Sequence, residues 1–125
     1  MNQNQPQRPQ PLNRRNKGQY YEQQARSFLE QQGLLFVCAN YHCRQGELDL
    51  IMREQQTLVF VEVRYRASSD YGGALSSVTP AKQRKIRHTA RYYLLSQKIN
   101  EAHQACRFDI VSYDNDQCSW LKNAF

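Results

Sequence analysis

The sequence predicts an α/β domain whose mixed four-stranded sheet is flanked by helices, in the order αβββαβ. Residues 46–51 and 58–66 have the composition of two neighbouring strands, and the second run alternates valine with larger or charged side chains. A helix signal over residues 79–97 separates this hairpin from a last strand at residues 108–113. A helical crossover joins parallel strands, normally with a right-handed connection, so the sheet should be mixed.

The chain has 125 residues, which is enough for one domain with a single core and too few for two. Residues 1–17 are rich in Gln, Pro, Asn and Arg, and we expect a disordered basic tail there, followed by a domain at residues 18–125. The first helix of the domain should run from about Gly18 to Gln32 and stop at Gly33.

Turn and cap signals place the remaining elements. Residues 34–41 open with an apolar run and should form the first strand, while residues 67–77 are rich in Gly and Ser and should form a loop. Thr79 followed by Pro80 is typical of a helix start, with threonine as the N-cap and proline at the first helical position. We expect a short terminal element within residues 117–125.

The net charge of +6 is concentrated in two segments without acidic residues, 1–17 and 82–91. Such segments favour a polyanionic partner, of which nucleic acid is the commonest, and the alternative is a solvated helix face with a solubilising tail. No apolar run approaches the length of a membrane span or a secretory signal, so we expect a cytoplasmic protein without a membrane partner. The four cysteines form no C-x-x-C pair, so we expect reduced thiols and no zinc site.

Carboxylates on the two hairpin strands are the most informative feature of the chain. If the two-residue turn lies at residues 55–56, Asp49 opposes Glu62, and if it lies at residues 54–55, Glu47 opposes Glu62. Directly opposed Cβ atoms lie roughly 4.5–5.5 Å apart, where like charges repel. A divalent cation between the carboxylates removes the repulsion, because hard cations take oxygen ligands.

Phosphodiester hydrolysis is a chemistry that such a metal site supports, because the ion activates water and offsets charge on the phosphate. Asp49, Glu62 and the carbonyl of Val63 are candidate ligands, and Arg64 is placed to bind the phosphate but cannot act as a base. Ordinary cross-strand ion pairs with Arg64 and Arg66 on a solvated face remain the alternative.

Six segments carry a family resemblance, and they are residues 46–51, 59–66, 71–72, 78–79, 82–84 and 107–111. In the last of them, pattern alone makes Asp109 a strand-edge partner for Arg107 or another cation. Through these segments the chain from 18 to 113 closely resembles the bacterial YraN family. The resemblance implies the restriction-endonuclease-like fold, which is the PD-(D/E)xK nuclease core, and a similarity to archaeal Holliday-junction resolvases.

In that nuclease core a first-helix glutamate, a strand aspartate and an E-x-K triplet build the metal site. By resemblance these roles fall on Glu22, Asp49, Glu62 and Arg64, although Glu22 on pattern alone would be solvated. Arg64 stands where lysine is usual, which keeps the charge and removes any base function. This departure bears on catalytic rate more than on metal binding, and Lys82 or Gln83 would partly compensate.

The sequence therefore predicts a nuclease-like domain that depends on Mg²⁺ or Mn²⁺ and acts on DNA, including branched DNA. The alternatives are a nucleic-acid-binding module that has lost catalysis and a protein-interaction scaffold. A nuclease that cuts two strands symmetrically works naturally as a two-fold homodimer, but the sequence leaves the oligomeric state open. The expected metal ligands are Glu22, Asp49, Glu62 and Val63, and the expected nucleic-acid contacts are Arg66, Lys82, Gln83, Arg84, Arg87 and Arg91.

Overall fold

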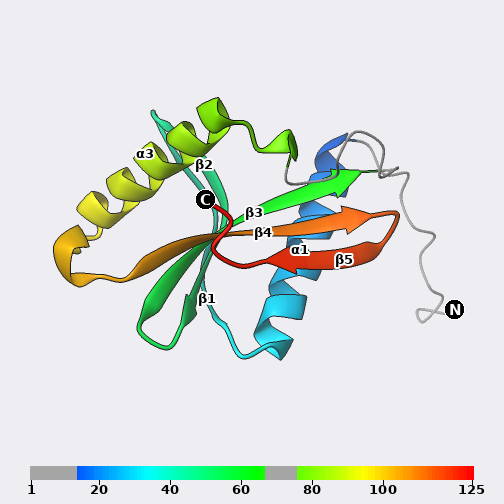
Figure 1. Ribbon diagram of the computed structural model, residues 1–125, viewed down its shortest axis with the longest axis horizontal. Helices are drawn as coiled ribbons and strands as arrows, with labels where there is room; N and C mark the ends of the chain where they lie inside the picture. Colours follow the sequence, from blue (N-terminus) through cyan, green and yellow to red (C-terminus); the bar gives the residue numbers. More distant parts are fainter. Residues whose placement is uncertain (1–13, 67–75) are drawn as a thin grey trace, which may run out of the picture.

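A five-stranded mixed sheet with one helix packed on each face forms the centre of the protein (Figure 1). The structure is a computed structural model that describes residues 14–66 and 76–125. The strands lie side by side in the order β1-β2-β3-β4-β5. The elements are α1 (Arg14–Gln31), β1 (Leu35–Cys43), β2 (Gly46–Glu54), β3 (Thr57–Arg66), α3 (Pro80–Ser96), the 3-10 helix η2 (Glu101–His103), β4 (Cys106–Asp114) and β5 (Gln117–Leu121).

The predicted mixed α/β architecture is confirmed. Strands β3 and β4 pair in parallel and are joined through α3, while every other neighbouring pair is antiparallel. The sheet has five strands and not the predicted four, because residues 117–121 form β5 against β4. Most residues of β5 are exposed, so this strand lacks the apolar alternation that marks a half-buried strand in a sequence.

Several predicted boundaries were wrong. Helix α1 begins at Arg14, so residues 14–17 belong to the helix and not to the tail. The Lys17 ammonium lies 5.6 Å from the centre of the Tyr65 ring, and this contact with β3 helps to hold a first turn that composition alone disfavours. Residues 1–13 of the predicted tail lie outside the described residues, as do residues 67–75 of the predicted loop.

The start of α3 follows the prediction. Thr79 is the N-cap, and its hydroxyl accepts a hydrogen bond of 3.2 Å from the backbone N–H of Lys82, with Pro80 opening the helix. Among the helices of residues 14–66 and 76–125, none is both long and apolar enough to cross a membrane.

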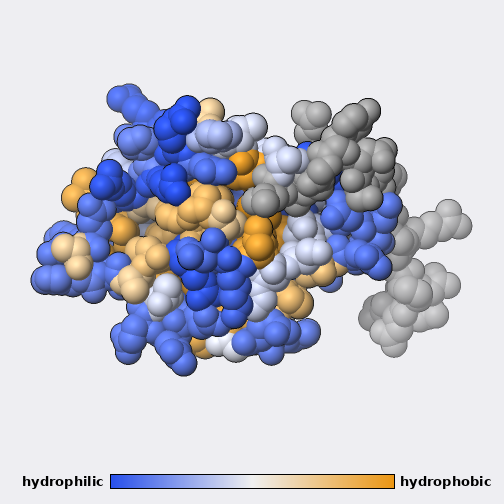
Figure 2. Space-filling view, viewed as in Figure 1, coloured by the Kyte–Doolittle hydropathy of each residue, from blue (hydrophilic) through white to orange (hydrophobic). Residues whose placement is uncertain are grey.

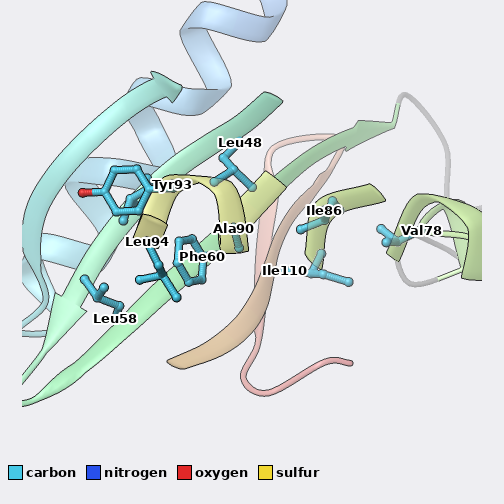
Figure 3. Close-up of a cluster of buried hydrophobic side chains, with 10 residues drawn as sticks. Leu48, Leu58, Phe60, Val78, Ile86, Ala90, Tyr93, Leu94 and Ile110 are labelled. Carbon is cyan, nitrogen blue, oxygen red and sulfur yellow. The ribbon is translucent and has the colours of Figure 1, made fainter. Parts of the chain in front are cut away.

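Two apolar clusters, one on each face of the sheet, hold the helices in place. The face shown in Figure 2 has apolar side chains near its middle, among hydrophilic ones. On the α3 side, Leu58 and Phe60 from β3 pack against Ala90 and Leu94 (Figure 3). On the α1 side, Val59 and Val61 pack against the helix. The alternation of β3 therefore sends its even-numbered side chains towards α3.

The register of the β2–β3 hairpin is the first of the two predicted. Leu50 pairs with Val61 and Glu54 with Thr57, so residues 55–56 form the turn. The β2–β3 ladder ends at the Leu50–Val61 pair, whereas the β1–β2 ladder continues to Gly46. Strand β2 therefore parts from β3 at Asp49, and Figure 1 shows the outer end of the β1–β2 hairpin turning away from β3.

Asp109 on β4 contacts Arg107, as predicted, and stabilises the β4–β5 side of the sheet. Its fully buried carboxylate accepts hydrogen bonds from Arg107 Nε at 3.0 Å, from Trp120 Nε1 at 3.0 Å and from the Asn123 backbone N–H at 2.9 Å. Arg107 also pairs with Glu54 on β2. This network ties β4 to β5 and to the turn of the central hairpin.

We predict that Asp109→Asn lowers the free energy of unfolding by about 3 kcal/mol, because it takes one of two carboxylate partners from the mostly buried Arg107 guanidinium and removes the charge from a fully buried acceptor. Urea unfolding at pH 7 measures the change. The control is Glu30→Gln, which removes an exposed ion pair with Arg26 and should change stability by less than about 0.5 kcal/mol. Equal stabilities of the two variants would contradict the role given to Asp109.

Candidate functional site

A cavity of about 730 Å³ opens where β2 parts from β3. Its walls come from α1, from the β1–β2 hairpin, from the end of β3 and from the start of α3, so side chains from both faces of the sheet reach it. The residues that line it are Gly18, Tyr21, Glu22, His42, Cys43, Gly46, Glu47, Asp49, Glu62, Val63, Arg64, Tyr65, Lys82, Lys85 and Ile86.

Asp49 lies at the point where the two strands separate. Its Oδ2 accepts a hydrogen bond of 2.8 Å from the backbone N–H of Val63. A side-chain carboxylate thus satisfies a donor of β3 beyond the end of the backbone ladder. The bond fixes the carboxylate in the cavity wall, and because it favours the charged form it opposes the rise in the Asp49 pKa that burial causes.

Glu62 is held by two cations on the α3 side of the sheet. Its Oε1 lies 3.0 Å from Arg64 Nη2 and 3.5 Å from Lys82 Nζ, and the residue is only 7% exposed. Burial and then the nearby Asp49 carboxylate raise the pKa of Glu62 to about 7, although Arg64 and Lys82 act in the opposite direction. Glu62 is therefore repelled by the Asp49 carboxylate and attracted by Arg64 and Lys82.

Glu22 reaches the cavity from α1. Burial raises its pKa to about 7, and the Asp49 and Glu47 carboxylates add to the rise, while a hydrogen bond with Asn40 opposes it. Glu47 itself is exposed, and its Oε2 lies 3.2 Å from His42 Nδ1, a contact that is an ion pair only when the imidazole is protonated. Asp49 thus interacts electrostatically with both Glu22 and Glu62, which come from different elements.

The guanidinium of Arg64 has unused hydrogen-bonding capacity inside the cavity. Among the residues that the structure describes, its buried Nε finds no hydrogen-bond partner, and its Nη2 meets Glu62 only as an ion pair without hydrogen-bond geometry. A buried donor without an acceptor costs about 1–3 kcal/mol, so an oxygen-rich anion beside Arg64 would be favoured.

The carboxylates fit a hard divalent cation by their chemistry. Asp49 and Glu62 offer oxygen ligands, and a positive ion would relieve the repulsion that raises their pKa values. Across residues 14–66 and 76–125, no three His, Cys, Asp or Glu side chains are already gathered as a metal-binding group. Binding would therefore require Glu62 to loosen its pairing with Lys82 and Glu22 to turn towards Asp49.

All of the predicted catalytic and metal-binding residues line this one cavity, namely Glu22, Asp49, Glu62, Val63 and Arg64. Lys82, which was predicted as a nucleic-acid contact, lies in the same wall. The ligand role of the Val63 carbonyl stays a prediction.

The predicted nucleic-acid contacts are divided between two places. Arg84, Arg87 and Arg91 line a different cavity on the other side of α3. Gln83 lies outside both linings and donates a hydrogen bond of 3.0 Å to the carbonyl of Val78, so its amide stabilises the helix start. Arg66 ends β3 and also lies outside both linings.

Sequence reasoning missed Gly46 and Lys85 in the cavity wall. Gly46 has a φ of 150°, and a Cβ there would come within 2.9 Å of Thr89 Oγ1, so α3 can pack closely only against glycine. Lys85 follows Lys82 by one helical turn, and this spacing was a usable signal. The close approach at Gly46 brings the lysines of α3 to the carboxylates.

We predict that the free energy of unfolding falls as pH rises from about 4.5 to about 7. Glu22 and Glu62 have folded-state pKa values near 7 against the ordinary value of 4.5, so the folded chain binds more protons in this range. Urea unfolding at several pH values measures the slope. Glu62→Gln should flatten it while Glu30→Gln should not, and an unchanged slope in Glu62→Gln would contradict the raised pKa.

Comparison with known proteins identifies the family. The model of the uncharacterised protein family UPF0102 matches residues 21–113. A UPF0102 protein of Aeromonas hydrophila is 55% identical over 109 residues, covering 87% of this chain and 84% of that protein. A UPF0102 protein of Psychromonas ingrahamii is 50% identical over 111 residues, covering 87% of this chain and 88% of that protein.

The UPF0102 protein YraN of Escherichia fergusonii is 50% identical over 117 residues, covering 94% of this chain and 89% of that protein. The resemblance to the YraN family is thereby confirmed. With the family model across the central region and relatives at about half identity across most of its length, this chain belongs to the uncharacterised protein family UPF0102.

Proposed function

We propose that this protein is a metal-dependent endonuclease that hydrolyses phosphodiester bonds in DNA, including branched DNA. The observation that carries the proposal is one cavity in which buried carboxylates face an arginine with an unpartnered donor. Carboxylates suit a divalent cation and the guanidinium suits a phosphate, and a nuclease must bind both next to each other.

The arrangement of elements supports a restriction-endonuclease-like core. The E-x-R triplet of Glu62 and Arg64 lies on β3, Asp49 lies on the neighbouring antiparallel strand, and Glu22 lies on the first helix. These are the places that the resemblance to the PD-(D/E)xK nucleases assigns to the metal-site residues. The parallel β3–β4 pair with its helical crossover agrees with the same core.

The proposed roles follow from where each group lies. Asp49, Glu62, Glu22 and the carbonyl of Val63 would hold Mg²⁺ or Mn²⁺, which when bound lowers the pKa of water and offsets charge on the phosphate. Arg64 would turn from its ion pair with Glu62 to bind a phosphate oxygen, because its unpaired Nε and Nη2 are shielded from solvent where the side chain now lies, and it stays protonated throughout. Water attacks phosphorus as the P–O bond to the leaving oxygen breaks.

Without a bound cation, burial and the neighbouring carboxylates raise the pKa of Glu22 to about 7. A cation that Glu22 holds as a ligand would lower this pKa, so the proton of the attacking water is assigned to solvent and not to Glu22. Lys82 lies 3.5 Å from Glu62, where it balances the carboxylate charge before a cation binds.

A second candidate is a nucleic-acid-binding module that has lost catalysis. The observation that favours it is the ion pair between Arg64 and Glu62, which places a permanent cation where the related nucleases carry lysine. Arg64→Lys separates the two candidates. Cleavage that appears only in this variant would support the inactive module.

We predict that the full chain cleaves DNA in Mn²⁺ and that Asp49→Asn slows cleavage by about 100-fold or more, since it weakens the metal site. Labelled four-way junction, flap and linear duplex DNA are incubated with each protein, and products are resolved on denaturing gels. Glu30→Gln, purified in the same way, should keep the wild-type rate. Equal product from wild type and Asp49→Asn would assign the cleavage to a contaminant.

We predict that Mn²⁺ raises the Tm at pH 8 and raises it much less at pH 5.5, where Glu22 and Glu62 are protonated. A free Mn²⁺ concentration of about 100 times Kd would raise the free energy of unfolding by about 2.7 kcal/mol. Thermal unfolding with and without Mn²⁺ measures the shift. Asp49→Asn should abolish it, and a shift of equal size in that variant would exclude this cavity as the binding site.

A further inference from the structure

Lys82 is the second cation beside Glu62, and it is more accessible than the first. Both cations contact the same carboxylate oxygen, with Lys82 Nζ 3.5 Å and Arg64 Nη2 3.0 Å from Glu62 Oε1. The Lys82 side chain is 42% exposed, whereas that of Arg64 is 22% exposed and its unpaired nitrogens are shielded from solvent. Of the two, Lys82 therefore presents its charge more openly to the cavity.

The start of α3 fixes the point from which the Lys82 side chain extends. The backbone N–H of Lys82 donates the hydrogen bond that the Thr79 hydroxyl accepts in the N-cap, at 3.2 Å. Further along the helix, Thr89 packs so closely on Gly46 that α3 is held against the β1–β2 hairpin. The backbone of Lys82 is thus fixed, while its four-carbon stem leaves the ammonium free to change partners.

Helix stability does not account for a lysine at this position. Lys82 is the third residue of α3, where the positive end of the helix dipole disfavours a cation. Glutamate or glutamine there would complete a capping box with Thr79. A lysine that weakens its own helix start, and that contacts a buried carboxylate of the cavity, suits a role in the reaction better than a role in folding.

Neighbouring polar residues of α3 do not reach the same place. The Gln83 amide donates a hydrogen bond of 3.0 Å to the Val78 carbonyl, and Gln83 lines neither cavity. Lys85 lines the carboxylate cavity, but within residues 14–66 and 76–125 it forms no ion pair with a carboxylate. Of these three residues, Lys82 is the one that contacts Glu62.

The ion pair with Glu62 cannot persist in full if Glu62 becomes a metal ligand. Under the proposed function, the Lys82 ammonium then needs another oxygen in the cavity as an acceptor. The attacking water gains negative charge as it gives its proton to solvent, and a fixed positive group beside it stabilises that charge.

We propose that Lys82 is a catalytic residue, which takes the place of the lysine that is missing from the E-x-R triplet. The inference rests on the proposed function, which supplies the attacking water and the phosphodiester. The ammonium donates a hydrogen bond to the attacking oxygen and keeps its own protons. The water gives its proton to solvent as its oxygen bonds to phosphorus, and the leaving oxygen takes a proton from solvent as its bond to phosphorus breaks. This role differs from the backbone contact that the sequence predicts for Lys82.

Lys82→Gln tests the proposal, because glutamine suits the capping box and the variant should fold. Its cleavage of labelled junction, flap and duplex DNA in Mn²⁺ should be slower by about 100-fold. Lys85→Gln removes the same charge from the same cavity wall and should lower the rate by no more than about 3-fold. A wild-type rate in Lys82→Gln, or an equal loss in the two variants, would overturn the inference.

Two measurements without turnover separate a catalytic role from a binding role. Fluorescence anisotropy in EDTA should give wild type and Lys82→Gln affinities for the same DNA within about 3-fold, with equal salt dependence. The rise in Tm that Mn²⁺ causes should also persist in Lys82→Gln, because the lysine is not a ligand. If either DNA binding or the Tm rise fell in proportion to cleavage, Lys82 would be a DNA contact or a support of the metal site, and the inference would be wrong.

Returning a lysine to the triplet tests whether the two positions serve the same place. Arg64→Lys in the Lys82→Gln background should cleave at least about 10-fold faster than Lys82→Gln alone, since an ammonium would again lie beside Glu62. No gain in the double variant would contradict the shared place. Urea unfolding of each variant confirms that the fold is retained.

The outcomes separate this inference from the proposed function. Cleavage that survives in Lys82→Gln and is lost in Asp49→Asn would overturn the inference alone. Cleavage only in chains that carry Arg64→Lys would also overturn it and would support the inactive module. If wild type and Arg64→Lys both fail to cut any of the DNAs, the proposed function is overturned and the inference falls with it.

Discussion

The hydrogen bond between the Asp49 carboxylate and the Val63 backbone N–H is the interaction on which the candidate site depends. It replaces backbone pairing where β2 leaves β3, so the strands separate without leaving this partly buried donor unsatisfied. A continued ladder would close the sheet and leave no cavity between α1 and α3. The same contact therefore opens the site and fixes one of its acidic groups.

Charge balance inside the cavity determines what it can bind. Burial disfavours the ionised forms of Glu22, Asp49 and Glu62. Arg64 and Lys82 offset part of that effect at Asp49 and Glu62, and a hydrogen bond with Asn40 offsets part of it at Glu22. An added cation favours the ionised carboxylates, while an added phosphate oxygen satisfies the free donor of Arg64. Under the proposed function, the cation would offset the carboxylate charge and the phosphate would accept the unpaired donors of Arg64, so each ligand would satisfy a different group.

The hairpin register and the α3 start were predictable because their signals are local. A two-residue turn leaves few registers, and Thr79 before Pro80 marks a helix start in any context. The prediction that Glu22 belongs to the site came from the family resemblance alone, because its position in the helix pattern indicates a solvated side chain. A short terminal element was expected within residues 117–125, but its pairing with β4 as strand β5 was not predicted, and neither was the first turn of α1. Contacts with β4 and with Tyr65 stabilise these two parts, and such contacts leave no local pattern.

The division of the basic helix shows what a sequence pattern cannot decide. A run of cations on α3 reads as one nucleic-acid surface, but at 3.6 residues per turn Lys82 and Lys85 point to one side while Arg84, Arg87 and Arg91 point to another. Which face of α3 lies against the carboxylates depends on the close packing of the helix against Gly46, which is a tertiary contact that the helix sequence does not encode. The two lysines therefore line the cavity that holds the carboxylates, and the three arginines line a separate cavity on the other side of α3.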